Sequence, residues 1–240
     1  MSDTRSMNGQ SAGPGPGARD RILANVRKAL DVPGGRADPR EAVVDLRIAE
    51  RRRHLLPARA TLPSADLRAQ FASYLIRGKA SVIDVADLAG VPLAIAEYLR
   101  SQNLPLTLRM GDDPRLRDLP WNTVSAMTVK LGRAEPATDT VTLSYAVAAA
   151  AETGTLVLAS GPDNPVSLSF LPDTHLVVLE AAMLVGAYEE AFDLVRKTLG
   201  DRVMPRTLNF ISGPSRTADI GGIPVMGAHG PIHLAVFVIG

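Results

Sequence analysis

Short apolar runs alternate with segments of helical spacing from about residue 80 onward. Runs of this length that are rich in β-branched residues are typical of buried strands. They cover residues 80–85, 104–110, 124–131, 141–144, 155–159, 175–180, 206–211 and 232–239. Residues 91–99 and 188–199 have helical spacing, 165–171 predicts a short helix or turn, and the alanine-rich 145–151 predicts a short turn or helix. This alternation predicts an α/β fold with a mainly parallel sheet flanked by helices.

The first 62 residues lack this rhythm. Residues 1–17 are rich in Gly and Pro and cannot form a core, so we expect a disordered tail. Residues 18–30 and about 41–56 repeat their apolar positions at helical spacing. We therefore expect a tail over 1–17, N-terminal helices within 18–62, and an α/β domain over 63–240 that opens with a helix ending near residue 77.

One stretch, residues 209–231, stands out between the last two predicted strands. It holds five Gly and three Pro, which preclude a continuous helix or strand, so its backbone N–H groups must face water or a ligand. It follows a strand, and open α/β sheets bind ligands beyond the carboxyl ends of their strands. The alternative is a long turn that is merely rich in Gly.

The composition of the chain excludes several classes of function. The 240 residues carry a net charge of +1, which gives no overall attraction to nucleic acid or membrane. Residues 1–60 hold 12 Lys/Arg and 7 Asp/Glu, a basic arm that either docks on an acidic surface or is simply solvated. The absence of Cys excludes disulfides, thiolate nucleophiles and Cys-ligated clusters. Without a signal peptide or a long apolar run, we expect a cytoplasmic protein with no membrane span.

The stretch 209–231 offers groups for binding a small anion. Hydroxyls, a Gly N–H and the fork of an Arg side chain together match a carboxylate. These candidate ligand-binding residues are Ser212, Gly213, Ser215, Arg216, Thr217, Asp219 and Gly230. Alternatively, Arg216 and Asp219 form an internal ion pair that holds the loop. The spacing matches neither a P-loop nor a nucleophile elbow.

A second candidate block lies at the start of the 155–159 strand. Thr153, Gly154 and Thr155 can hold a carboxylate or phosphate through hydroxyl and N–H groups, and Glu152 is a candidate base or nucleophile. The alternative is a turn that starts the strand.

Two histidines complete the candidates. His229, with Gly227 and Gly230 close by in the sequence, is a candidate proton shuttle or a brace for the loop. Gly230 and Pro231 separate it from His233, which prevents the helical spacing that a metal pair uses, so we expect no metal site. His175 lies at the head of a strand, where we expect a structural role.

Four parts of this sequence resemble the LUD domain, the family of bacterial lactate-utilisation proteins, and specifically its stand-alone C subunit. The resemblance is carried by Ala-Glu-Thr-Gly-Thr-Leu-Val-Leu at 151–158, Leu-Pro-Asp-Thr-His at 171–175, Ser-Gly-Pro-Ser-Arg-Thr-Ala-Asp-Ile at 212–220 with Gly-Ala-His-Gly-Pro at 227–231, and the helix at 21–30. The chain departs from the family at Gly221 and Gly222, where Glu is usual, and at Glu152, where Asp is more frequent.

This resemblance implies a Rossmann-like fold related to sugar-phosphate isomerases and CoA transferases (NagB/RpiA/CoA transferase-like). It also implies an accessory or substrate-handling role in oxidising L-lactate to pyruvate, beside A- and B-type subunits that carry the iron–sulfur clusters, so we expect no cofactor in this chain. Two alternatives remain. One is a self-sufficient CoA-transferase- or isomerase-like enzyme acting on a small anion. The other is an assembly or regulatory module that works through its N-terminal helices.

Overall fold

The computed structural model describes residues 17–30, 39–217 and 225–240. Its contacts divide the chain into two units, one ending at His54 and one running from Leu55 to Gly240. The expected tail over 1–17 therefore lies almost wholly outside the described residues. The first unit contains two helices, α1 (Ala18–Ala29) and α2 (Pro39–Glu50). The second helix is shorter than the 41–56 expectation, because Arg51 adopts a left-handed backbone with φ 45° and ends it.

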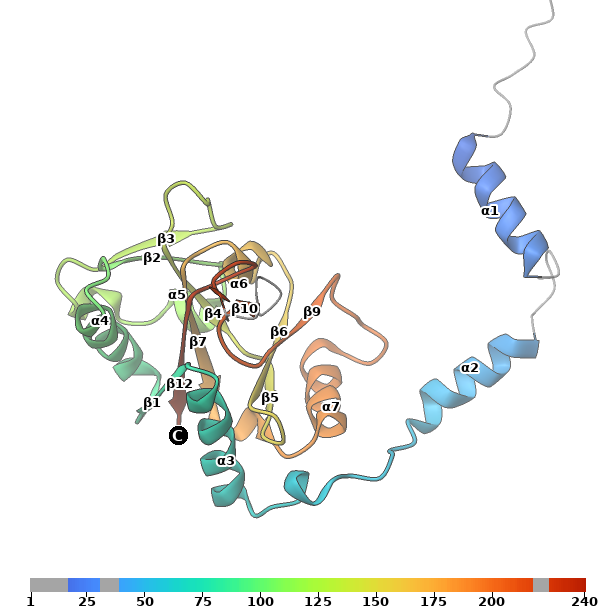
Figure 1. Ribbon diagram of the computed structural model, residues 1–240, viewed down its shortest axis with the longest axis horizontal. Coiled ribbons are helices and arrows are strands. Elements are labelled where there is room, and N and C mark those ends of the chain that lie inside the picture. Colours follow the sequence, from blue (N-terminus) through green and yellow to red (C-terminus); the bar gives the residue numbers. More distant parts are fainter. Residues whose placement is uncertain (1–16, 31–38, 218–224) are drawn as a thin grey trace, which may run out of the picture. The chain divides into compact units, whose positions relative to one another are not determined.

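The larger unit contains the three sheets of the described residues, which have six, four and two strands (Figure 1). Its helices are α3 (Ser64–Arg77), α4 (Val91–Ser101), α5 (Pro114–Arg117), α6 (Ser167–Phe170) and α7 (Tyr188–Leu199). Its strands are β1 (Ser81–Val85), β2 (Thr107–Met110), β3 (Thr128–Leu131), β4 (Val141–Tyr145), β5 (Ala148–Ala150), β6 (Thr155–Ala159), β7 (Thr174–Glu180), β8 (Leu184–Val185), β9 (Leu208–Ile211), β10 (Arg216–Thr217), β11 (Val225–Met226) and β12 (His233–Ile239). Single 3-10 turns cover Ala58–Ala60, Leu88–Gly90, Trp121–Thr123 and Ala181–Met183.

The large sheet has six strands in the order β1-β12-β7-β4-β2-β3, and every pairing in it is parallel. This confirms the α/β class and the mainly parallel sheet. Strands β4 and β7 in its centre are buried on both faces, as their continuous apolar runs predict.

A smaller four-stranded sheet, in the order β8-β5-β6-β9, packs beside the large one. The prediction of a turn or helix over 145–151 is wrong, because Ala148–Ala150 form a strand between β6 and β8. Alanine favours helices locally, but three buried methyl groups fit the narrow space between two packed layers, and tertiary packing overrides propensity.

Four layers result, and Figure 1 shows them in order from α4 through the large and small sheets to α7. On one face of the large sheet α4 packs through Ile95 and Leu99. On the other face α3 contributes Phe71 and Leu75 to a core shared with the small sheet. Helix α7 covers the outer face of the small sheet. Each of these fully buried side chains stabilises the fold by roughly 1.5–3 kcal/mol.

Residues 55–62, which we expected to belong with the N-terminal helices, are part of the larger unit. The carbonyl oxygen of Arg59 accepts a hydrogen bond from Gln70 Nε2 at 2.8 Å. The carbonyl oxygen of Ala60 lies so close to Gly186 that a Cβ there would be 1.8 Å away. This segment therefore forms part of the packed body.

Candidate functional site

Four hydroxyl groups meet where the two candidate blocks of the sequence come together. Thr155 Oγ1 lies 2.6 Å from Ser212 Oγ and 2.8 Å from the Tyr188 hydroxyl, which is 2.7 Å from Thr153 Oγ1. Thr153 and Thr155 are themselves 2.7 Å apart. Segments 57 positions apart in the sequence are thus joined by a direct hydrogen bond.

The sheet register explains this meeting. Strand β6 runs antiparallel to β9 with Leu156 paired to Ile211, so the residues just before β6 and just after β9 are neighbours. Gly154 makes the turn into β6 with φ +64°, and a Cβ on it would lie 2.5 Å from Tyr74 Cβ. A residue without a side chain is therefore required at this point of the block.

Glu152 is buried beside this network, and both of its carboxyl oxygens have structural partners. Oε1 accepts the backbone N–H of Tyr188, the first residue of α7, at 3.1 Å. Oε2 lies 3.4 Å from the Arg59 guanidinium. A carboxylate at the N-terminal end of a helix stabilises the positive end of its dipole. In this arrangement Glu152 anchors α7 to the start of the small sheet.

A cavity of about 210 Å³ lies next to the network. It is bounded by the end of β9, the following loop, and the amino ends of β7 and β12. Its described lining residues are Ser169, Phe170, His175, Phe210, Ile211, Ser212, Gly213, Pro214, Ser215, His229, Gly230, Pro231 and Leu234. The cavity lies at the carboxyl end of β9, as the position of the loop predicted. In the large sheet, however, it lies at the amino ends of the strands, whereas open α/β sheets usually bind ligands at the carboxyl ends.

Hydrogen bonds tie the two ends of the loop together around this cavity. Ser215 N–H donates to the Pro231 carbonyl at 2.8 Å, and Ser215 Oγ accepts from His229 N–H at 3.2 Å. The Gly227 N–H donates to the Ser215 carbonyl at 2.9 Å. The walls are apolar with a few hydroxyls, the composition typical of small-molecule sites, and the volume is below the usual range for drug-sized ligands.

The structure separates the remaining candidates. Ser212, Gly213, Ser215, His229 and Gly230 line the cavity. Glu152, Thr153, Gly154 and Thr155 do not line it and reach it only through the Thr155–Ser212 bond.

Arg216, which we expected to grip the carboxylate, is exposed on β10, where it pairs with Met226 of the antiparallel strand β11, and the described lining does not include it. Thr217 is the second residue of β10 and pairs with Val225. Asp219 lies outside the described residues, as do Gly221 and Gly222, so the expected Arg216–Asp219 pair stays a prediction.

Two residues that contribute to the candidate site were not predicted from the sequence. Tyr188 has the spacing of a helix face, yet its hydroxyl joins the Thr153–Thr155 network. His175, expected to be structural, is fully buried in β7 and also lines the cavity. Burial lowers the pKa of His175 to about 3. No local pattern marks either residue, because both roles arise from contacts distant in sequence.

A second polar cluster lies at the carboxyl ends of β4 and β7. Buried Asp113 holds Arg115 by two side-chain hydrogen bonds of 3.0 and 2.6 Å, and the Arg115 guanidinium lies 3.9 Å from the centroid of the Tyr145 ring. The Tyr145 hydroxyl donates to Glu180. Burial and then this bond raise the pKa of Tyr145. Because the four side chains satisfy one another, the cluster stabilises this edge of the sheet.

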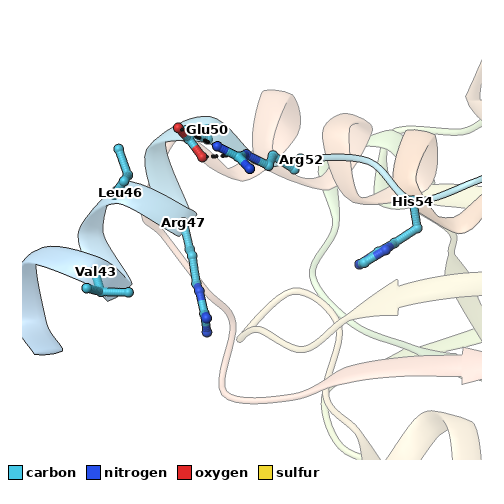
Figure 2. Close-up of a pocket in the computed structure, with 6 residues that line it drawn as sticks. All are labelled: Val43, Leu46, Arg47, Glu50, Arg52 and His54. Atoms are coloured by element: carbon cyan, nitrogen blue, oxygen red, sulfur yellow. Dashed lines mark hydrogen bonds and ion pairs between the residues drawn. The ribbon is translucent and has the colours of Figure 1, made fainter.

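Figure 2 shows a hollow in the N-terminal unit, along α2 and the segment after it. Its lining residues are Val43, Leu46, Arg47, Glu50, Arg52 and His54. Arg52 Nε lies 2.6 Å from Glu50 Oε2, so the acid in this hollow is paired with a neighbouring base. None of these residues belongs to the predicted site.

Within the described ranges, no three His, Asp or Glu side chains gather as a metal-binding group. None of the helices described there is both long and apolar enough to cross a membrane.

Comparisons with known proteins find a family and several relatives for this chain. The LUD domain model matches residues 65–239. The chain is 34% identical over 100 residues to a protein named lactate utilization protein C from Bacillus subtilis, which covers 41% of this chain and 42% of that protein. The corresponding protein of Bacillus licheniformis is 36% identical over 108 residues, an alignment that covers 45% of this chain and 44% of that protein. These alignments therefore span less than half of the relatives' lengths.

Two further matches extend over more of the chain. Protein YkgG of Escherichia coli is 29% identical over 184 residues, covering 72% of this chain and 78% of that protein. A crystal structure of a DUF162 family protein from Deinococcus radiodurans superposes with a TM-score of 0.55 at 26% identity, covering 75% of this chain and 99% of that one. With the domain match spanning most of its length and the expected fold in place, the chain belongs to the LUD-domain family.

Proposed function

We propose that this protein takes part in lactate utilisation as an accessory or substrate-handling subunit, and that the cavity beside Ser212 binds a small carboxylate such as L-lactate. The oxidation of lactate to pyruvate would then be completed with iron–sulfur partner subunits. The family and the names of the relatives from Bacillus species support the lactate assignment.

The observation that carries the proposal is the bond between Thr155 Oγ1 and Ser212 Oγ. It joins two of the three sequence blocks that resemble the family most closely, at the edge of a cavity whose mainly apolar wall carries a few hydroxyls. Hydroxyl groups fixed by neighbouring hydroxyls are preorganised, so binding requires little ordering of side chains. This favours a binding role for the site.

The side chains that are present support the proposed division of labour. The 240 residues include no Cys, so they cannot supply thiolate ligands for an iron–sulfur cluster. Glu152, the candidate nucleophile, has both carboxyl oxygens committed to the α7 N-terminus and to Arg59. These features fit a subunit that holds substrate for redox centres in its partners.

A binding measurement on the full chain tests the proposal. We expect isothermal titration calorimetry to detect L-lactate binding, and Ser212→Ala to weaken it about five- to tenfold, because one hydrogen bond is lost directly and Thr155 loses its partner. Ser101→Ala is the matched control, since Ser101 is exposed and its Oγ bonds only to local partners at the end of α4, the Tyr98 carbonyl and Gln102 Nε2. Equal affinities for wild type and Ser212→Ala, or no binding by the wild type, would contradict the assignment of this cavity.

Partner subunits are tested separately. Purification from cells grown on lactate should bring down proteins that carry iron–sulfur clusters, recognisable by their brown colour and visible absorption. Recovery of the chain without any cluster protein contradicts the proposed complex.

A further inference from the structure

His175 has one ring nitrogen with a partner and one without. It is the second residue of β7, its exposed fraction is 0%, and it lines the cavity. Its Nε2 lies 3.0 Å from Ser144 Oγ. Its Nδ1 is buried and has no hydrogen-bond partner among the described residues. A buried polar atom left without a partner destabilises the folded state, so the position calls for a physical reason.

The direction of the ring relates Nδ1 to the cavity. The two nitrogens of an imidazole point away from each other, so a ring whose Nε2 faces Ser144 on β4 turns Nδ1 away from β4. On the other side of β7 lies β12, where Leu234 is the register partner of His175. Leu234 lines the same cavity. The Nδ1 edge of the ring therefore faces the β12 side of β7, where Leu234 borders the cavity, and because Nδ1 is buried, a ligand must displace atoms of the cavity wall to reach it.

The surroundings of the ring determine what it can bind. Burial lowers the pKa of His175 to about 3, so the imidazole is neutral at pH 7 and offers one uncharged hydrogen bond. Phe170 and Leu234 are apolar neighbours in the cavity wall. A carboxylate placed against these groups would lose its hydration without gaining an opposite charge, which costs several kcal/mol. Burying an uncharged hydroxyl group at the same place costs far less free energy.

The exposed end of the cavity suits the charged group. Ser212 and His229 are exposed, Ser215 is half-buried, and all three line the cavity. Hydroxyls there can hydrogen-bond a carboxylate that remains in contact with water. A ligand that spans the cavity would thus present its charge to the loop and its neutral polar group to β7.

We propose that His175 is a specificity-determining residue, whose Nδ1 hydrogen-bonds the 2-hydroxyl of a small 2-hydroxy carboxylate while the carboxylate lies beside Ser212 and Ser215. The inference rests on the proposed function and deepens it, because it assigns the group that distinguishes a 2-hydroxy acid from an acid of the same size without the hydroxyl. Local sequence reasoning gave His175 only a structural role.

Two conservative substitutions separate the two nitrogens. The amide of His175→Asn occupies the region of Nδ1 and cannot reach Ser144, whereas the longer side chain of His175→Gln places its amide near Nε2 and leaves the Nδ1 region empty. Calorimetry on the full chain would compare L-lactate with propionate, which lacks the hydroxyl. Thermal unfolding of each variant establishes that it is folded.

We expect the wild type to bind L-lactate at least about fivefold more tightly than propionate, a preference that one hydrogen bond supplies. His175→Asn should retain a preference and His175→Gln should lose it. The opposite order, with His175→Gln retaining the preference, would overturn the inference and leave His175 as a structural partner of Ser144. If the wild type binds lactate with no preference over propionate, only this inference fails. If it binds neither acid, the proposed function fails as well.

A measurement on the wild type does not depend on the folding of the variants. The chain has only four His, so ¹⁵N-labelled histidine gives a simple spectrum. With a pKa of about 3, the His175 ring should keep constant resonances between about pH 5 and 8, which identifies it. Its Nδ1 resonance should shift on adding L-lactate and remain unchanged with propionate. No shift with lactate at a concentration that saturates binding would refute the assignment.

Discussion

Replacing Glu152 should weaken the fold more than it weakens any chemistry. Oε1 of Glu152 accepts the backbone N–H of Tyr188 at the first turn of α7, and the side chain is only 7% exposed. In Glu152→Ala this N–H loses its partner in half-buried surroundings.

The magnitude follows from three contributions. An unsatisfied half-buried N–H costs about 1–3 kcal/mol. Loss of the negative charge at the helix N-terminus adds about 0.3–1 kcal/mol. The contact to Arg59 contributes less than about 1 kcal/mol, because the Arg59 side chain is 53% exposed. Together these give about 2–4 kcal/mol, or a decrease in Tm of roughly 5–15 °C for a chain of this size.

Differential scanning calorimetry measures the effect, with two comparisons. Glu152→Gln keeps an oxygen that can accept from Tyr188 and loses only the charge at the helix N-terminus and the ion contact to Arg59, so it should lose less than about 2 kcal/mol. Glu97→Ala removes an exposed carboxylate from α4 and should leave Tm within about 1 °C. A Glu152→Ala protein that melts with the wild type would refute the anchoring role. A Glu152→Gln protein that is fully stable yet inactive in lactate-dependent electron transfer would point back to chemistry at Glu152.

Two further predictions concern packing and pH. Gly186→Ala should lower the free energy of unfolding by at least about 2 kcal/mol, because its Cβ would lie 1.8 Å from the Ala60 carbonyl oxygen. Urea unfolding measures the effect, and Gly17→Ala is the control, because its Cβ would meet no atom closer than 3.8 Å. Equal unfolding midpoints for Gly186→Ala and the wild type would contradict the close approach of Gly186 to the Ala60 carbonyl. The free energy of unfolding should also fall as the pH is lowered below about 6.5, because the unfolded chain protonates His175 there while the folded protein, with a His175 pKa of about 3, does not. Urea unfolding at pH 7, 6 and 5 should show a smaller decrease for His175→Asn, and identical slopes would show that His175 is not the group responsible.

Much of the architecture could be predicted from local pattern. The apolar runs at 141–144, 155–159 and 175–180 correspond to the buried strands β4, β6 and β7, and the spacing at 188–199 matches α7. Burial on both faces requires continuous apolar runs, so these central strands are the easiest to identify. Ala148–Ala150 was mistaken because its strand character comes from β6 and β8 on either side, and alanine itself carries no such signal.

The candidate site divides in the same way. The sequence determined that two glycine-containing segments carry hydroxyls and a histidine suited to a small anion, because residue type and turn chemistry are local properties. Only the tertiary structure decided that Thr155 and Ser212 touch, that the Tyr188 hydroxyl joins them, and that Arg216 is exposed outside the cavity lining. Only it decided that His175 is buried with one nitrogen paired. Strand register and sheet packing set these contacts between residues distant in the chain, and a local sequence pattern contains no record of that geometry.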